Sequence, residues 1–286
     1  PRPYSQAGQV TLTDPTVLRL LLERHGLQPQ KRWGQHFLTS SRVVDAIVDR
    51  FAGYAGILEV GPGPGVLTHR LSLTATKLIA VEVDPIAVSA LTETAPTAEV
   101  VQADALSIDL EGLFARLPEP RGLVSNMPYN ITGPLVTAFA EARAGFGRAV
   151  LMMQREVAVR ILARPGSSDF GSLSVYLQSQ FAIERVTDAP PGCFYPPPKV
   201  ESVVLQLTPL VHGHPTDLER LFFAVVRSGF QQPRKTLANN LAGFRGLGRE
   251  RVEQLLEHQG FDRRVRPHQI PVEAWKALSL AIADGT

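Results

Sequence analysis

The sequence of 286 residues predicts an α/β protein in which a doubly wound, mostly parallel β-sheet is followed by a small helical domain. Between residues 56 and 153, short apolar segments that are typical of buried parallel strands alternate with segments of helical periodicity. After residue 214 the strand pattern disappears and only helical segments remain. Strands and helices that alternate with short connections favour a parallel sheet with right-handed crossovers.

The predicted sheet has seven strands. The five apolar segments of its parallel part cover residues 56–60, 77–83, 98–103, 122–126 and 148–153. Two further candidates, residues 181–189 and 200–209, lie close together in the chain and could form an antiparallel hairpin at the sheet edge. Helices are expected from Gly65, from Pro85, near 109–116 and near 131–142.

Three segments are expected along the chain. Residues 1–52 form an N-terminal helical arm, in which a capped helix after Thr13 or Asp14 precedes the segment KRWGQHFL. Residues 53–211 hold the sheet, and residues 212–286 form a small helical domain. The helices of that last domain are expected near 216–229, 233–243, 249–259 and 272–283.

Charge and composition limit the classes of function. The net charge is +3 in residues 1–38 and in residues 212–286 but −4 in residues 39–211. This division suits a small-molecule domain flanked by surfaces that meet an anionic polymer, although differences of this size also arise by chance. A single cysteine, Cys193, excludes an intramolecular disulfide and a Cys-rich metal site. The first residues do not resemble a signal peptide, and the sequence has no apolar run of about 20 residues that could span a membrane. We therefore expect a cytoplasmic protein.

A glycine-rich turn follows the first predicted strand of the sheet. In the motif EVGPGPG, Gly61, Gly63 and Gly65 allow a tight turn and a close approach of the backbone to a ligand, in front of a helix N-terminus. The spacing differs from the dinucleotide fingerprint, and Pro62 and Pro64 remove two amide donors that a pyrophosphate would require. The motif therefore predicts a nucleotide-type site of a different kind.

Acidic side chains end the next two predicted strands. Glu82 follows Gly61 at the distance along the chain where a carboxylate can accept hydrogen bonds from both ribose hydroxyls of a nucleoside. Asp104 ends the third strand, where it can reach the edge of an adenine. Either acid alone could simply cap a helix. Because the carboxyl ends of parallel strands meet in one crevice, we expect both acids and Asn126 to line a single site.

Asn126 ends the fourth strand and is followed by Met127, Pro128 and Tyr129. An exocyclic aromatic amine is a poor nucleophile, because its lone pair is delocalised into the ring. The side-chain oxygen of Asn126 and the main-chain carbonyl of Met127 could each accept one N–H and favour a pyramidal nitrogen. Pro128 would hold the turn, and the flat face of Tyr129 would stack on an extruded base. The alternative is an ordinary Asn-X-Pro turn.

The motifs EVGPGPG, VEVD, ADAL and NMPYN stand in this order at the ends of successive predicted strands. Together they resemble the class I S-adenosylmethionine-dependent methyltransferases that act on the amino group of adenine. The segments KRWGQHFL, FYPPPKVESVV and FQQPRKTLANNL are similar to those of the KsgA/RsmA-like dimethyladenosine transferases of small-subunit ribosomal RNA. The resemblance covers residues 28–270 and implies a Rossmann-like fold, S-adenosyl-L-methionine as cofactor and N6,N6-dimethylation of two neighbouring adenosines in 16S rRNA.

The resemblance also implies roles for individual residues. The residues expected to bind the cofactor are His36, Leu38, Gly61, Gly63, Glu82, Val83, Asp104, Ala105 and Asn126. The residues expected at the reacting base are Asn126, Met127, Pro128, Tyr129 and Phe194, with the rings of Tyr129 and Phe194 on its two faces. The family often has asparagine where this chain has His36, which can still donate one hydrogen bond. It commonly has N-L-P-Y, and Met127 keeps the main-chain carbonyl of that motif.

The expected partner is the 16S rRNA of a small ribosomal subunit precursor, bound by a monomer without metal or membrane. Phosphate contacts without base specificity are expected from Lys31, Arg32, Arg234, Lys235, Arg263, Arg264 and Arg266. Arg155 and Glu156 match a family segment, MMQREVAVR, and a structural ion pair explains them as well as a catalytic role. The histidines lack the spacing of a metal site.

Three other functions fit parts of the pattern. A nicotinamide-dependent oxidoreductase would share the sheet, but it would need a different glycine motif and a proton-transfer residue in place of NMPY. A non-catalytic RNA-binding or ribosome assembly factor could use the same fold, although the intact NMPY and glycine turn argue against it. A 23S rRNA adenine N6-methyltransferase would share the core motifs, and the longer C-terminal segment favours the small-subunit branch by resemblance only.

Overall fold

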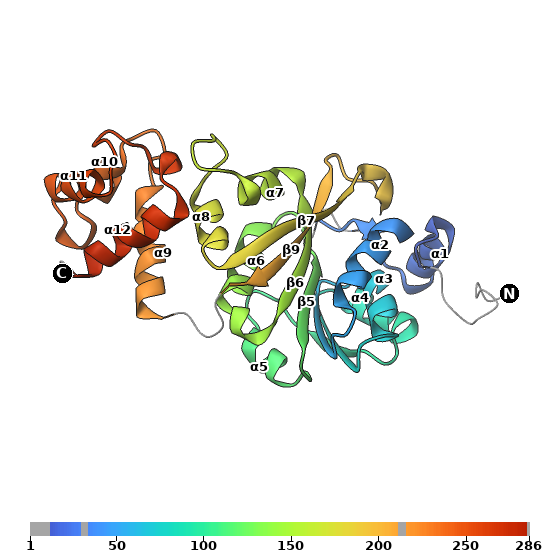
Figure 1. The fold of residues 1–286 in the computed structure, drawn as a ribbon. Coiled ribbons are helices and arrows are strands. Elements are labelled where there is room, and N and C mark those ends of the chain that lie inside the picture. The colour runs from blue at the N-terminus through green and yellow to red at the C-terminus, as the bar shows by residue number, and fades with distance from the viewer. Residues whose placement is uncertain (1–11, 30–33, 211–215, 285–286) are drawn as a thin grey trace. The chain divides into compact units, whose positions relative to one another are not determined.

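The computed structural model describes residues 12–29, 34–210 and 216–284 (Figure 1). Those within 1–155 and 183–209 form a compact sheet unit, and those within 156–182 and 210–286 form a compact helical unit. This division differs from the three expected segments, because residues 156–182 pack with the C-terminal helices. Phe170 and Val175, for example, belong to the hydrophobic core of the helical unit.

The large sheet has seven strands in the order β4-β3-β2-β5-β6-β9-β7, as the sequence predicted in number and type. Their bounds are β2 (Gly56–Val60), β3 (Lys77–Glu82), β4 (Glu99–Gln102), β5 (Arg121–Asn126), β6 (Arg148–Gln154), β7 (Phe181–Ala189) and β9 (Ser202–Pro209). Strands β2 to β6 pair in parallel, and β9 runs antiparallel to β6. The chain order reverses on either side of β2, and ligands of open α/β sheets bind in the crevice at such a reversal.

Helices follow four of the parallel strands, and two of these helices begin at a capping side chain. They are α3 (Val66–Ser72), α4 (Pro85–Thr94), α5 (Leu110–Ala115) and α6 (Thr132–Glu141). The side chain of Asp84 accepts a hydrogen bond from the amide of Ile86 at 3.0 Å, and Asp109 accepts one from Gly112 at 2.9 Å. These caps fix where the two helices begin, α4 at Pro85 and α5 at Leu110.

The N-terminal arm belongs to the sheet unit. It contains α1 (Pro15–His25), capped by Asp14, and α2 (Ser41–Val48). Leu18, Leu21 and Leu22 of α1 recur at helical spacing and are buried in the core of the sheet unit. The arm is therefore packed against the sheet unit through an apolar face, as the amphipathic pattern predicted.

A second, two-stranded sheet was not expected from the sequence. It joins β1 (Phe37–Leu38) to β8 (Phe194–Tyr195) in antiparallel orientation. The amide of Thr39 extends the pairing with a 2.7 Å hydrogen bond to the carbonyl of Cys193. Strands of two residues are too short to show a period of two, so no sequence pattern indicated them. The pairing fixes the end of the arm to the proline-rich segment before β9.

The described residues of the helical unit form six α-helices. They are most of α7 (Arg155–Leu162), α8 (Ser172–Gln178), α9 (Asp217–Gly229), α10 (Leu237–Leu241), α11 (Arg249–His258) and α12 (Val272–Asp284). Short 3₁₀ turns cover Asp49–Phe51, Arg143–Gly145, Pro191–Cys193, Phe244–Gly246 and Pro267–Gln269 of the chain. The ring of Trp275 is fully buried and stacks on Phe230 with ring centroids 5.4 Å apart. None of the described helices is long and apolar enough to cross a bilayer.

The contact between α9 and α12 yields a prediction for stability. A Cβ atom added at Gly229 would lie 2.4 Å from the ring of Trp275, so Gly229→Ala must displace a fully buried ring. Overpacking costs about 1–3 kcal/mol, which exceeds the roughly 1 kcal/mol that alanine gains over glycine in a helix. We expect a lower melting temperature, measured by calorimetry. The matched control is Gly133→Ala in α6, which meets no atom within 4 Å and should not destabilise the protein. Equal melting temperatures for the two variants would contradict the packing described here.

Candidate functional site

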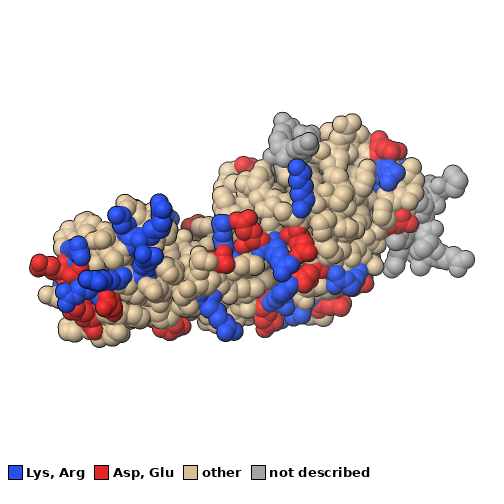
Figure 2. Space-filling model, turned by 90° about the horizontal axis from the view of Figure 1, so that it is seen from above, with Lys and Arg blue, Asp and Glu red and all other residues tan. Residues whose placement is uncertain are grey.

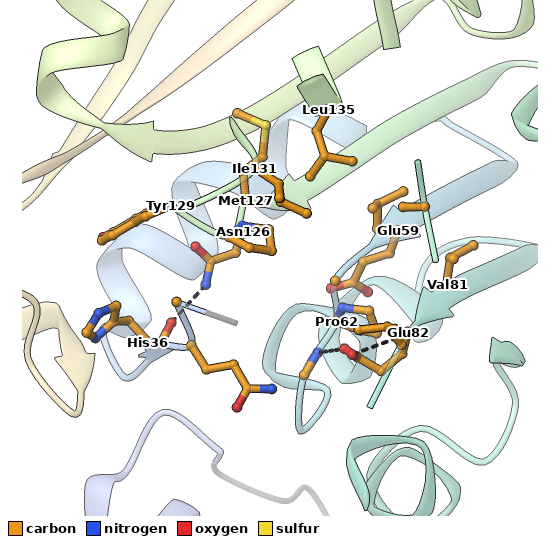
Figure 3. A pocket seen from close by; sticks show the side chains of 18 of the residues that line it. His36, Glu59, Pro62, Val81, Glu82, Asn126, Met127, Tyr129, Ile131 and Leu135 are labelled. Atoms are coloured by element: carbon orange, nitrogen blue, oxygen red, sulfur yellow. Dashed lines mark hydrogen bonds between the residues drawn. The ribbon is translucent and has the colours of Figure 1, made fainter. Parts of the chain in front are cut away.

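A cavity in the sheet unit lies at the carboxyl ends of the parallel strands (Figure 3). Its wall combines residues 34–38 of the arm, the glycine turn after β2, the ends of β3 to β5 and the start of α6. The predicted site residues that line it are His36, Leu38, Gly61, Gly63, Glu82, Val83, Asp104, Ala105, Asn126, Met127, Pro128 and Tyr129. Segments far apart in the sequence are thus brought to one place, and the individual roles of these residues stay predictions.

The glycine turn needs its glycines for two different reasons. Gly63 has a φ of +56°, and a Cβ atom there would lie 3.0 Å from the ring of Phe37. Gly65 has a φ of +90°, and its Cβ would lie 2.5 Å from the hydroxyl of Thr94 in α4. Other residues rarely adopt such angles. The backbone of the turn therefore lies close to both the arm and α4, and the turn lines the cavity with main chain at Gly61 and Gly63 and with the rings of Pro62 and Pro64.

The carboxylate of Glu82 fixes this turn. One oxygen accepts a hydrogen bond from the amide of Gly63 at 3.0 Å, and the other accepts from Val83 and Asp84, each at 2.9 Å. Burial raises the pKa of Glu82, and the three amide donors partly offset that rise. A carboxylate oxygen can accept more than one hydrogen bond, so Glu82 can also accept bonds from hydroxyl groups of a ligand.

The ends of β3 and β4 form a wall with one acid and two apolar side chains. One oxygen of Asp104 accepts a hydrogen bond from the amide of Leu106 at 2.9 Å, which leaves its second oxygen for a ligand. Val83 is 45% exposed and Leu106 is 42% exposed, and both line the cavity. An apolar wall beside a hydrogen-bond acceptor suits a flat base with an amino group. Sequence analysis missed Leu106, although it stands in the motif ADAL.

Glu59 is a second residue that sequence analysis missed. It is the second-last residue of β2, it is 1% exposed, and it lines the cavity. Among the described residues its Oε2 atom has no hydrogen-bond partner. Burial raises its pKa to about 8, and the nearby Glu82 carboxylate adds to the rise. Two buried acids at one cavity favour a ligand that carries positive charge. Glu59 is the first letter of EVGPGPG, but the interpretation of that motif used only its glycines and prolines.

Asn126 is held in one orientation by the arm. Its Nδ2 atom donates a 3.1 Å hydrogen bond to the main-chain carbonyl of His36 (Figure 3). The amide of Met127 donates to the carbonyl of Met152 in β6 at 3.0 Å, and the carbonyl of Pro128 accepts from the amide of Ile131 at 3.2 Å. The turn after β5 is therefore fixed on both sides, and the Oδ1 atom of Asn126 is left to accept a hydrogen bond from a ligand.

The ring of Tyr129 is held at two points. Its hydroxyl lies 2.6 Å from the hydroxyl of Ser202, and the His36 ring lies beside it with centroids 5.3 Å apart and planes at 31°. The Nδ1 atom of His36 lies 2.8 Å from the carbonyl of Pro196. Because a carbonyl oxygen can only accept a hydrogen bond, Nδ1 is the donor and carries a proton. His36 thus contacts Asn126 through its carbonyl and Tyr129 through its ring.

Phe194 does not line the cavity, contrary to expectation. Its ring is 4% exposed and belongs to the hydrophobic core of the sheet unit. The cause is the pairing with β1, in which Phe194 stands opposite Leu38 and is buried with it. Its neighbour Tyr195 is half-buried, with the guanidinium of Arg19 5.5 Å from its ring centroid. Phe194 is therefore a core residue in this structure, and its role at the reacting base stays a prediction.

Arg155 and Glu156 have separate partners. Arg155 forms an ion pair with Glu201, and Glu156 forms one with Arg160, and all four side chains are exposed. Exposed ion pairs of this kind contribute about 0–1 kcal/mol to stability. They do not line the cavity. Within the described ranges, no group of three His, Cys, Asp or Glu side chains could hold a metal ion.

The five described basic residues that sequence analysis assigned to RNA lie in the helical unit. Its two basic segments, 234–235 and 263–266, lie together because the amide of Leu237 donates a 2.8 Å hydrogen bond to the carbonyl of Val265. Arg263 pairs with Glu257 at 3.1 Å. The exposed side chains without an acidic partner among the described residues are Arg234, Lys235, Arg264 and Arg266, here called the basic patch. Figure 2 shows Lys and Arg side chains gathered on the helical unit. Lys31 and Arg32 lie outside the described residues.

Comparisons with known proteins show the family. A model described as ribosomal RNA adenine dimethylase matches residues 26–284. Among curated relatives, ribosomal RNA small subunit methyltransferase A of Pelotomaculum thermopropionicum is 35% identical, over 96% of this chain and 98% of that protein. The protein of the same name from a Nostoc species is 36% identical, over 88% of this chain and 97% of its own.

Solved structures share the architecture. A dimethyladenosine transferase from Plasmodium falciparum has a TM-score of 0.72 and 24% identity, and the match covers 87% of this chain and 98% of that one. The 23S rRNA methyltransferase ErmE has a TM-score of 0.63 and 28% identity, and the match covers 86% of this chain and 99% of that one. The first likeness shows the fold, which is that of class I methyltransferases.

The residues of the cavity fit S-adenosylmethionine, which has a ribose, an adenine and a positive charge. Glu82 offers acceptors for hydroxyl groups, and Val83 and Leu106 offer an apolar wall. The unpartnered buried oxygen of Glu59 lies where a cation would stabilise it. From the family match over residues 26–284 and this fit, we conclude that the chain belongs to the ribosomal RNA adenine dimethylase family and is an S-adenosylmethionine-dependent methyltransferase.

Proposed function

We propose that this protein dimethylates N6 of two neighbouring adenosines in 16S rRNA, on a precursor of the small ribosomal subunit, as a cytoplasmic monomer. The observation that carries the proposal is the orientation of Asn126, whose Nδ2 is bound to His36 while Oδ1 is left for a substrate amine. The curated relatives named as small-subunit methyltransferases, which match this chain almost from end to end, support the choice of RNA.

The chain's own residues would act by position and by oriented dipoles. When bound, the cofactor supplies an electrophilic methyl group. The oxygens of Asn126 and Met127 would each accept one N–H of the adenine amine, so that the nitrogen lone pair points away from them. Such alignment can contribute roughly 7–11 kcal/mol, and one well-placed dipole roughly 3–4 kcal/mol. A strong general base is unnecessary, since the methylated nitrogen is acidic and can lose its proton to water.

Methylation of isolated ribosomal subunits tests the proposal. Unmethylated small and large subunits are incubated separately with the protein and labelled cofactor, and the labelled nucleotides are mapped. We expect two adjacent dimethylated adenines in the small-subunit RNA. Label in large-subunit RNA would favour the second candidate, a 23S rRNA methyltransferase, which the 28% identity to ErmE makes a specific alternative. Absence of transfer to either RNA by a folded, cofactor-binding protein would favour a non-catalytic assembly factor.

The raised pKa of Glu59 predicts that cofactor affinity depends on pH. Glu59 keeps its proton at neutral pH, because its pKa is about 8. A cation near a carboxylate favours the charged form, so cofactor binding should release that proton. Affinity should therefore rise with pH up to about 8, by at most about tenfold per pH unit, and then level off. Calorimetry from pH 6 upward measures it.

The control for this prediction is Glu59→Gln, which keeps the shape of the protonated acid and cannot titrate. The α-amino group of the cofactor titrates equally in both experiments, so the difference between the two proteins isolates Glu59.

The same linkage predicts that the unfolding free energy of the ligand-free wild type falls as pH rises from about 4.5 to about 8, because the folded state holds the proton more tightly. Identical pH profiles for the two proteins would contradict the assignment.

The basic patch predicts a change in the salt dependence of RNA binding. Reversal of Arg264 and Arg266 to Glu should weaken binding to 16S rRNA and reduce the slope of log affinity against log salt by about 0.7–0.9 for each lost phosphate contact. The control is the reversal of Arg220 and Arg249 to Glu, which changes the net charge by the same amount. These two arginines already pair with Asp217 and Glu253. Binding is measured by titration at several salt concentrations. If both double variants keep the wild-type slope, the patch is an ordinary solvated surface.

A further inference from the structure

We propose that Ser202 is a positioning residue for the target adenine, because its hydroxyl fixes the ring of Tyr129 at the wall of the cavity. The two hydroxyl oxygens are 2.6 Å apart, within the range of hydrogen bonds between hydroxyl groups. The inference rests on the proposed function, in which the Tyr129 ring stacks on the extruded base. Ser202 itself does not line the cavity, so it acts through Tyr129.

The sheet topology explains how a residue so distant in sequence reaches this ring. Strand β9 runs antiparallel to β6, so its first residues lie at the edge where the parallel strands end. In the register of the sheet, Asn126 stands beside Met152 of β6, and Ser202 stands beside Gln154 two residues further on. The start of β9 therefore lies next to the turn that follows β5. A parallel strand at this position would have begun at the opposite edge.

Burial makes the hydroxyl of Ser202 costly unless it is bonded. Ser202 is fully buried, at 0% exposure, and its Oγ atom is bonded to the half-buried Tyr129. A buried hydroxyl that loses its partner costs about 1–3 kcal/mol. Burial also raises the pKa of Tyr129, so the phenol stays neutral and can donate at physiological pH. An alanine at position 202 would not need a buried hydrogen-bond partner. The role of the serine hydroxyl is therefore to hold the hydroxyl of Tyr129.

A second contact limits the ring from the side. The His36 ring lies 5.3 Å from the Tyr129 ring, and its Nδ1 atom is held by the carbonyl of Pro196 at 2.8 Å. A base between the two rings would need them about 7 Å apart, twice the van der Waals separation of about 3.5 Å between carbon atoms. The base therefore stacks on the face of Tyr129 away from His36. With the hydroxyl fixed by Ser202 and one face covered, the ring is a rigid platform, which is the kind of preorganisation that alignment needs.

A double-mutant cycle tests the inference. Single-turnover methyl transfer to unmethylated small subunits is measured, with saturating cofactor, for wild type, Ser202→Ala, Tyr129→Phe and the double variant. Removal of one hydrogen bond should slow transfer roughly two- to tenfold in either single variant. The double variant should be no slower than the slower single one, because both changes delete the same bond. Ser202→Thr, which keeps a hydroxyl, should recover most of the rate.

Other measurements separate positioning from general damage. Affinity for S-adenosylhomocysteine should be unchanged in the single variants, and 2-aminopurine placed at the target adenine should report altered stacking without any methyl transfer. Ser279→Ala, which removes another buried serine hydroxyl, should keep the wild-type rate. A wild-type rate for Ser202→Ala, or additive losses in the double variant, would overturn the inference. If Ser202→Ala does not fold, Tyr129→Phe still tests the bond, and an inactive wild type would instead refute the proposed function.

Discussion

The hydrogen bond between Nδ2 of Asn126 and the carbonyl of His36 is the contact on which the site depends. It joins the N-terminal arm to the end of a central strand, and it leaves the acceptor atom of the amide for a substrate. The bond exists because β1 pairs with β8, which fixes the backbone of the arm beside the strand ends. The same pairing brings Pro196 to His36 and His36 to Tyr129. One short pairing thus orients an amide, an imidazole and an aromatic ring together.

The electrostatics of the cavity are set by two buried acids on neighbouring strands. Glu82 satisfies its charge with three main-chain amides, whereas Glu59 has an oxygen without a partner among the described residues. Burial raises the pKa of both side chains, which means that the ligand-free cavity stabilises negative charge poorly. A cationic ligand removes that penalty, while a phosphate would increase it. This explains in physical terms why a glycine turn rich in proline serves a sulfonium nucleoside rather than a dinucleotide.

Sequence patterns predicted the large sheet well, because its parallel strands are short, mainly apolar segments, and some of them end at a polar residue, as at Glu82 and Asn126. They could not predict β1 and β8, which have two residues each, and so gave no sign that Phe194 is buried in the core. Glu59 was missed because nothing in the sequence shows that its carboxylate is buried without a partner. Ser202 was missed because its contact with Tyr129 depends on the register of an antiparallel strand 73 residues away along the chain.

The most direct test of the account is the single-turnover rate of methyl transfer by Asn126→Ala, measured with saturating RNA and cofactor. If the amide oxygen orients the adenine amine, the rate should fall by about a hundredfold or more, the scale for loss of one preorganised dipole. The affinities for S-adenosylhomocysteine and for RNA are measured beside it, and we expect RNA affinity to change little. A folded Asn126→Ala protein that transfers methyl groups at the wild-type rate would show that Asn126 only forms a turn, and would contradict the mechanism.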